Sequence, residues 1–163
     1  PGGTPGGARC PRGGAPAGVD GVLLVDLPPE EAGEFQQAFD AAGLALVMLA
    51  SPTTSPARAA MLSANAQGYL YYVSYAGVTG ADRLDTQVAG RRLQELRAAA
   101  KVPVVAGFGI KDAASAAAMA VDADGVVVGS ALVSMLADAA DAEAAAGRAR
   151  EFLAPLRQAV DAG

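Results

Sequence analysis

The strongest constraint on the fold of this chain is a repeat of short, Val- and Leu-rich runs, each followed by a helical pattern. The runs lack the polar–apolar alternation of a half-exposed strand, so both faces of each strand are expected to be buried. Such strands, alternating with helices, predict parallel β/α units with helices covering the sheet. The predicted strands are 21–27, 44–50, 68–74, 102–108 and 125–129.

The segments between these runs have helical spacing and recognisable helix ends. Phe35 and Phe39 are four residues apart and share one face of a helix that ends at Gly43. Ser55, which precedes a proline, is a predicted N-cap. The predicted helices are 29–43, 56–64, 86–100 capped by Thr86 with Leu93 and Leu96 inward, a short helix capped by Asp112, 130–137, and one from about Asp141 with Phe152, Leu153, Leu156 and Val160 on one face.

Composition excludes several classes of function. The 163 residues carry a formal net charge of −5 without a basic run, so we expect no nucleic-acid partner. No apolar run approaches the roughly 18–20 residues of a membrane span, so no membrane partner is expected. Histidine is absent, which excludes His-dependent triads and His-ligated metals, and we predict no metal site. The single cysteine, Cys10, favours a reducing, cytoplasmic location.

The first segment of the chain differs from the rest. Residues 1–17 are rich in Gly and Pro and contain no large apolar residue. Such a segment does not bury enough surface to offset its ordering entropy, so we predict a disordered tail. The strand–helix pattern begins at Gly18, and residues 18–163 are the predicted folded domain.

Two architectures fit five parallel units, a doubly wound open sheet and a stretch of a (β/α)8 barrel. The strand ends favour the barrel, in which a phosphate often binds between the last two β/α loops at a short extra helix. One predicted strand ends in Gly107 and Gly109, and the next ends in Gly129 and Ser130. The N–H groups of these glycines could approach a phosphate because no Cβ blocks them. Gly80 could line a third side of the same phosphate site.

Each of these residues also has a plain structural interpretation. The glycines could be ordinary turn residues. Asp26 is the only carboxylate at the carboxyl end of a predicted strand, where it could serve as an acid–base group or make a structural hydrogen bond. Tyr69 and Tyr71 alternate with Tyr72, so they share a face, and Tyr71 is the one nearer the candidate site.

The strand ends, taken in order, resemble those of the tryptophan synthase α subunit family. The matching segments are GVDGVLLVDLP, SPTT, GYLYYVSYAGVTG, VPVVAGFGI and DGVVVGSALV, and the resemblance covers about 18–160. The resemblance implies a partial (β/α)8 barrel of about five units. It also implies a carbon–carbon lyase activity, the cleavage of indole-3-glycerol phosphate to indole and glyceraldehyde 3-phosphate in tryptophan biosynthesis. No cofactor is implied for this subunit, because pyridoxal phosphate belongs to its partner, the β subunit.

The resemblance also assigns roles to residues. It places the phosphate group of a small phosphate ester at strand-end residues, the reacting end beside Tyr71, and Thr79 in a loop that closes over substrate. Asp26 would line the site near the subunit contact. The implied phosphate-binding residues are Gly80, Phe108, Gly109, Gly129 and Ser130, and the implied indole pocket is lined by Leu23, Val25 and Leu49.

One departure from the family is large. The family needs a Glu on its second strand and an Asp in the following loop, within a motif like FSDPxADGP, and these 163 residues contain neither that motif nor the family's first three β/α units. We therefore expect a fragment that is inactive alone, with no catalytic residue other than the candidate Asp26. The alternatives are another phosphate-binding barrel enzyme, such as a ribulose-phosphate or thiamine-phosphate relative, and a non-catalytic module that binds phosphate or a β subunit.

Overall fold

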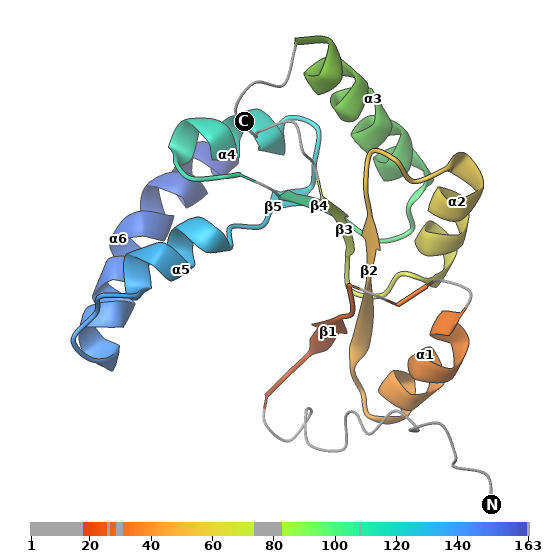
Figure 1. Cartoon of the computed structure of the whole chain (residues 1–163), viewed down its shortest axis with the longest axis horizontal. Coiled ribbons are helices and arrows are strands. Elements are labelled where there is room, and N and C mark those ends of the chain that lie inside the picture. Colours follow the sequence, from red (N-terminus) through yellow and green to blue (C-terminus); the bar gives the residue numbers. More distant parts are fainter. Residues whose placement is uncertain (1–17, 26, 29–30, 74–82, 108, 163) are drawn as a thin grey trace, which may run out of the picture.

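The computed structural model describes residues 18–25, 27–28, 31–73, 83–107 and 109–162, of which 83–89 are described by backbone alone. Five parallel strands lie side by side in chain order (Figure 1). This order confirms the prediction of successive parallel β/α units. The strands are β1 (Gly21–Leu23), β2 (Ala45–Ala50), β3 (Leu70–Val73), β4 (Val104–Gly107) and β5 (Gly125–Val126).

Helices follow every strand. Figure 1 shows α1, α2 and α3 along one side of the sheet, while α4, α5 and α6 gather beyond β5. This alternation, with each strand paired to the next along the chain, is the geometry of consecutive (β/α)8 barrel units. The helices are α1 (Ala32–Ala41), α2 (Pro56–Asn65), α3 (Arg83–Ala99), α4 (Ala113–Ala120), α5 (Ser130–Leu136) and α6 (Ala142–Asp161).

Two apolar clusters hold these elements together. The larger one buries Phe39 of α1, Leu46 of β2 and Tyr72 of β3, each at most 1% exposed, between the sheet and the first three helices. Full burial of such a side chain stabilises the fold by about 1.5–3 kcal/mol. The smaller cluster joins Ile110, Ala116 and Leu156, and so packs α6 onto α4. Leu93 and Leu96 are buried, as the helical spacing predicts.

Several predicted boundaries and one orientation are wrong. β1 ends at Leu23 rather than 27 because Val25 already lies in a turn, and β5 pairs with β4 over two residues only. α3 begins at Arg83, so Thr86 lies within the helix and is not its cap. Leu153 is 37% exposed, although Leu156 of the same predicted face is buried. Edge strands and helix starts depend on tertiary contacts that sequence periodicity does not contain.

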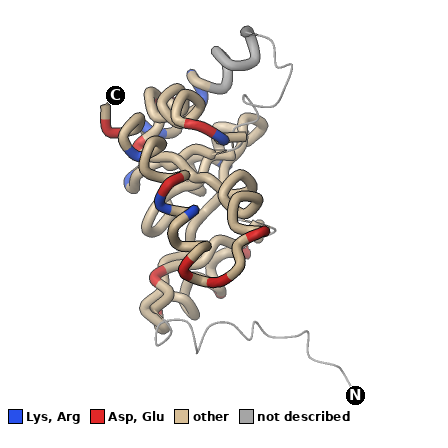
Figure 2. The backbone as a smooth tube through the Cα atoms, turned by 90° about the vertical axis from the view of Figure 1, so that its left-hand side faces the viewer, with Lys and Arg blue, Asp and Glu red and all other residues tan. Residues whose placement is uncertain are grey.

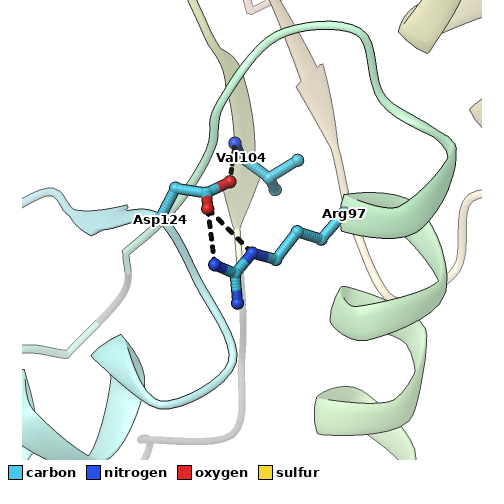
Figure 3. Close-up of polar contacts among 3 residues, drawn as sticks. All are labelled: Arg97, Val104 and Asp124. Atoms are coloured by element: carbon cyan, nitrogen blue, oxygen red, sulfur yellow. Dashed lines mark hydrogen bonds and ion pairs between the residues drawn. The ribbon is translucent and has the colours of Figure 1, made fainter. Parts of the chain in front are cut away.

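The amino-terminal ends of the strands are joined by a carboxylate. Asp124, just before β5, accepts hydrogen bonds from the guanidinium of Arg97 on α3, at 2.8 and 2.7 Å (Figure 3). Its second oxygen accepts the backbone N–H of Val104, the first residue of β4, at 2.9 Å. Because Val104 is fully buried, its N–H depends on this carboxylate.

Replacing Asp124 by Ala is therefore expected to lower the free energy of unfolding by about 1–3 kcal/mol, the cost of leaving a buried N–H unpaired. Urea unfolding followed by circular dichroism measures this loss. The matched control is Glu95→Ala, which removes only the exposed pair between Arg92 and Glu95, at 3.1 Å. That control should change stability by no more than about 1 kcal/mol. Equal effects of both substitutions would contradict the assignment.

Candidate functional site

The candidate phosphate loops lie next to each other. β4 and β5 are parallel neighbours, with Val105 opposite Gly125 and Ala106 opposite Val126. The chain after β5 stays beside β4, because the N–H of Val127 donates to the carbonyl of Ala106 at 2.9 Å. The carboxyl ends of both strands therefore open on the same edge of the sheet, as the barrel interpretation requires.

Gly107 and Gly109 are needed for two different local reasons. A Cβ on Gly107 would lie 2.6 Å from the carbonyl oxygen of Val127 and 3.1 Å from the hydroxyl of Tyr71. Gly109 has a φ of +68°, in the left-handed region that other residues rarely adopt. The first glycine lets β4 and the segment after β5 approach, and the second turns the chain away from β4.

Gly129 is required by neither packing nor a positive φ. It is exposed, it is the N-cap of α5, and, apart from its chain neighbours, no atom of the described residues lies within 4 Å of the position that a Cβ would take. No side chain caps this helix at Gly129, and Ser130 begins it. The first backbone N–H groups of α5 follow this exposed residue, and the helix dipole favours a negative charge at that end.

Tyr71 connects β3 to this edge of the sheet. Its hydroxyl donates to the carbonyl oxygen of Gly107 at 3.4 Å. Burial raises the pKa of Tyr71, and the nearby phenol of Tyr69 raises this pKa further. The hydroxyl is therefore protonated at neutral pH and can donate a hydrogen bond. Tyr72 points to the other face, as alternation predicts, and burial raises its pKa to about 12 despite the opposing charge of Arg92.

A cavity of about 320 Å³ lies at the carboxyl ends of β1 and β2. It brings together Val25 and Leu49, two of the three residues expected around the indole ring. Leu23, the third, does not line the described part of this cavity and is half-buried within β1. The other described residues that line the cavity are Leu24, Leu27, Met48, Ser51, Thr53, Thr54, Arg58 and Leu62.

Four polar residues line this cavity that the sequence analysis does not identify as site residues. Ser51, Thr53 and Thr54 form a folded loop, in which the Ser51 N–H donates to the Thr54 hydroxyl at 2.9 Å. Arg58, in the first turn of α2, adds a cation. The sequence does contain one clue to the position of Arg58. Ser55, the predicted N-cap of α2, accepts a hydrogen bond from the Arg58 N–H at 3.3 Å, so Arg58 lies in the first turn, beside the loop.

Other predicted site residues lie outside the described part of the chain. Asp26 falls in a gap after β1, Thr79 and Gly80 fall within 74–82, and Phe108 falls between β4 and Gly109. The predicted disordered tail, 1–17, is likewise not described. Their roles remain predictions from the sequence.

The described residues carry few other features that indicate a function. None of their helices is both long enough and apolar enough to cross a membrane. They contain no group of three or more His, Cys, Asp or Glu side chains arranged to hold a metal ion. Figure 2 shows Lys and Arg positions scattered among Asp and Glu positions rather than gathered in one stripe.

Comparisons of this sequence with a family profile and with curated proteins all identify the same family. The family profile described as tryptophan synthase alpha chain matches residues 12–161. The tryptophan synthase alpha chain of Xylella fastidiosa (strain 9a5c) is 70% identical over 155 residues, which cover 95% of this chain and 58% of the relative. That of Xanthomonas campestris pv. campestris (strain B100) is 72% identical over 148 residues, 90% of this chain and 54% of the relative. The chain thus spans little more than half the length of these curated relatives.

Solved structures agree with the sequence comparison. The tryptophan synthase alpha chain of Legionella pneumophila subsp. pneumophila matches with a TM-score of 0.73 and 39% identity, over 90% of this chain and 54% of that one. A chain of the tryptophan synthase a2b2 complex of Pyrococcus furiosus matches with a TM-score of 0.74 and 31% identity, over 88% of this chain and 58% of that one. The ordered strand ends, the profile match and these relatives together show that the chain belongs to the tryptophan synthase alpha chain family.

Proposed function

We propose that this chain supplies the phosphate-binding wall and part of the indole-lining wall of a site for indole-3-glycerol phosphate. The observation that carries the proposal is the adjacency of the β4 and β5 ends, which brings Gly109, Gly129 and Ser130 to one edge of the sheet. Backbone N–H groups at the start of α5 favour an anion there. Gly80 and Phe108 complete the proposed phosphate-binding set, and Thr79 is proposed to close over it.

The organic part of the substrate is proposed to occupy the neighbouring strand ends. Val25 and Leu49 line the same cavity and offer an apolar surface to a flat ring. Tyr71 lies on β3, between β2 at that cavity and β4 at the phosphate loops, and its hydroxyl donates to the carbonyl oxygen of Gly107 at the end of β4. Leu23 and Asp26 belong to the same proposal, at the end of β1.

The Gly129→Val substitution tests the phosphate assignment. Because a Cβ at Gly129 meets no atom within 4 Å among the residues that the structure describes, its chain neighbours aside, the fold should persist. The side chain would instead occupy the space in front of α5, so binding of glycerol phosphate should become undetectable in a calorimetric titration. Circular dichroism provides the folding control. Unchanged affinity in the folded variant would show that phosphate does not bind there.

The family's partner and cellular setting extend this proposal. We propose that the chain acts with a tryptophan synthase β subunit, on the strength of its similarity to a chain of the Pyrococcus furiosus a2b2 complex. The alpha chain itself is proposed to need no cofactor, with pyridoxal phosphate confined to the β subunit. A cytoplasmic location is proposed because a single cysteine offers no disulfide framework suited to an oxidising compartment.

A further inference from the structure

A second cavity, of about 190 Å³, lies between α2 and α3 on the side of the sheet that these helices cover (Figure 1). Two buried residues of the sheet, Ala50 of β2 and Tyr72 of β3, form its floor. Tyr72 alternates with Tyr71, whose hydroxyl contacts the end of β4, so the two phenols lie on opposite faces of β3. The cavity is therefore on the other side of the sheet from the Tyr71 side chain.

This cavity differs from the larger one of about 320 Å³ at the carboxyl ends of β1 and β2. Of the described residues, only Ser51 and Thr54 line both cavities. On α2, Arg58 lines the larger cavity and Ala60 lines the smaller one. Because an α-helix turns by about 100° per residue, these two residues lie on nearly opposite sides of α2. A ligand in the smaller cavity would thus have contacts of its own.

The walls of the smaller cavity are mostly apolar and suit a single flat ring. Ala59 and Ala60 line it from α2, and Leu96 and Ala99 line it from α3. Since an alanine side chain ends at Cβ, the two helices leave a space that larger side chains would fill. An apolar cavity of about 150 Å³ in a protein can hold a benzene molecule. A volume of about 190 Å³ therefore accommodates one aromatic ring with a small polar substituent.

The charged groups of the smaller cavity indicate which substituent fits. Arg92 is the only cation among the described residues that line it. The Arg92 guanidinium donates to Glu95 from Nη1 at 3.1 Å, and these side chains are 46% and 65% exposed, so the pair lies at the mouth of the cavity. Glu95 engages one nitrogen of a guanidinium that carries five N–H donors, so a planar carboxylate can accept hydrogen bonds from the other donors.

The floor of the smaller cavity does not repel an anion. Burial raises the pKa of Tyr72 to about 12, so its phenol is neutral at physiological pH. The charge of Arg92 lowers this pKa against the effect of burial, which indicates that the guanidinium lies near the phenol. A ring above Tyr72 would therefore have its polar substituent within reach of Arg92.

We propose that the cavity between α2 and α3 binds a small aromatic carboxylic acid as its anion, with the ring between the two helices and the carboxylate on Arg92. One cation at the mouth matches one carboxylate, and the apolar walls match a ring that carries no further charge. The cavity does not include the strand-end residues assigned to phosphate, so this inference stands apart from the proposed function.

Titration of the 163-residue chain with benzoate, followed by NMR, tests the proposal. Benzamide is the control ligand, because it has nearly the same shape and no charge. We expect benzoate to bind at one site and benzamide to bind at least about tenfold more weakly, since hydrogen bonds to a charged group are the stronger ones. Absence of benzoate binding, or equal affinities for benzoate and benzamide, would overturn the proposal.

Charge-matched substitutions then locate the carboxylate. Arg92→Gln should weaken benzoate binding at least about tenfold. Arg91→Gln makes the same change in net charge one residue away, at an exposed position outside the cavity lining, and should keep the affinity of the parent. Equal affinities for these two variants would overturn the proposal. So would loss of binding in Arg58→Gln with retention in Arg92→Gln, which would place benzoate in the larger cavity.

A second pair of substitutions locates the ring. Ala99→Leu adds an apolar side chain at the exposed rim of the smaller cavity and should weaken benzoate binding by occupying the same space. Ala98→Leu adds the same side chain at an exposed position of α3 that does not line the cavity, and should leave the affinity unchanged. Circular dichroism confirms that each variant is folded. Equal affinities for the two leucine variants would overturn the assigned site, whatever the phosphate titrations show.

Discussion

A polypeptide of these 163 residues is expected to release no indole from indole-3-glycerol phosphate above the uncatalysed background. The cleavage is a retro-aldol step, which needs protonation of the indole carbon that loses its substituent and removal of a proton from a side-chain hydroxyl. Positioned general acids and bases contribute roughly 10²–10⁴-fold each. The resemblance assigns these two tasks to a Glu on the family's second strand and an Asp in the loop that follows it. Neither segment occurs in these 163 residues, so both factors should be lost together.

The residues near the strand ends do not replace those two groups. Asp26 could cover one of the two roles at most. Tyr71 is a weak base at neutral pH because burial raises its pKa above the usual value. Its proton is retained throughout the neutral range, so the hydroxyl can donate a hydrogen bond but does not remove a proton from substrate.

The measurement is indole release, with the full-length Xylella fastidiosa alpha chain as the positive control. Adding a β subunit should not restore cleavage, because it supplies neither of the two carboxylates. Co-expression with the part of the Xylella fastidiosa alpha chain that lies outside the match, which the resemblance implies carries the Glu and the Asp, should restore it. Turnover by the 163-residue polypeptide alone would contradict this prediction and would make Asp26 the candidate catalytic group.

Sequence patterns predict this fold well where local chemistry decides the structure. Ser55 followed by proline sets the start of α2, and Asp112 forms a capping box with Ser115 at the start of α4. The buried runs identify all five strands, and the strand ends, which favour a barrel over a doubly wound sheet, predict that the strands lie in chain order. The ends of β1 and β5 are less predictable because, among the described strands, each pairs with one neighbour, and the pairing stops where that contact stops.

The candidate site is less predictable than the fold. The glycines at the ends of β4 and β5 are visible in the sequence because both follow buried runs. Arg58 is not, since a cation in the first turn of a helix is common on solvated surfaces, and only the folded loop 51–54 brings it to the cavity. The sequence also treats Gly107 and Gly129 alike, whereas their surroundings differ sharply.

This difference makes Gly107→Val the most damaging single substitution that the strand ends offer. A Cβ at this position would lie 2.6 Å from the carbonyl oxygen of Val127 and 2.9 Å from its Cβ. The nearer atom belongs to the backbone, so no side-chain rotation relieves the contact, and β4 must move away from the segment after β5. Overpacking of this kind costs about 1–3 kcal/mol and occasionally more. We expect the upper end of that range, because valine also adds two methyl groups beside Tyr71.

Urea unfolding of Gly107→Val and Gly129→Val, measured side by side, tests this expectation. Both substitutions add the same side chain, each at the end of one of two neighbouring strands. Among the described residues outside the immediate chain, a Cβ meets close atoms at Gly107 and none at Gly129. Gly107→Val should unfold at much lower urea, or fail to fold at all, while Gly129→Val should keep the midpoint of the parent. Stability of a small domain is only about 5–15 kcal/mol, so a loss near 3 kcal/mol is readily measured. Similar midpoints for the two variants would mean that β4 and the chain after β5 are not in close contact, which would also separate the two halves of the proposed phosphate site.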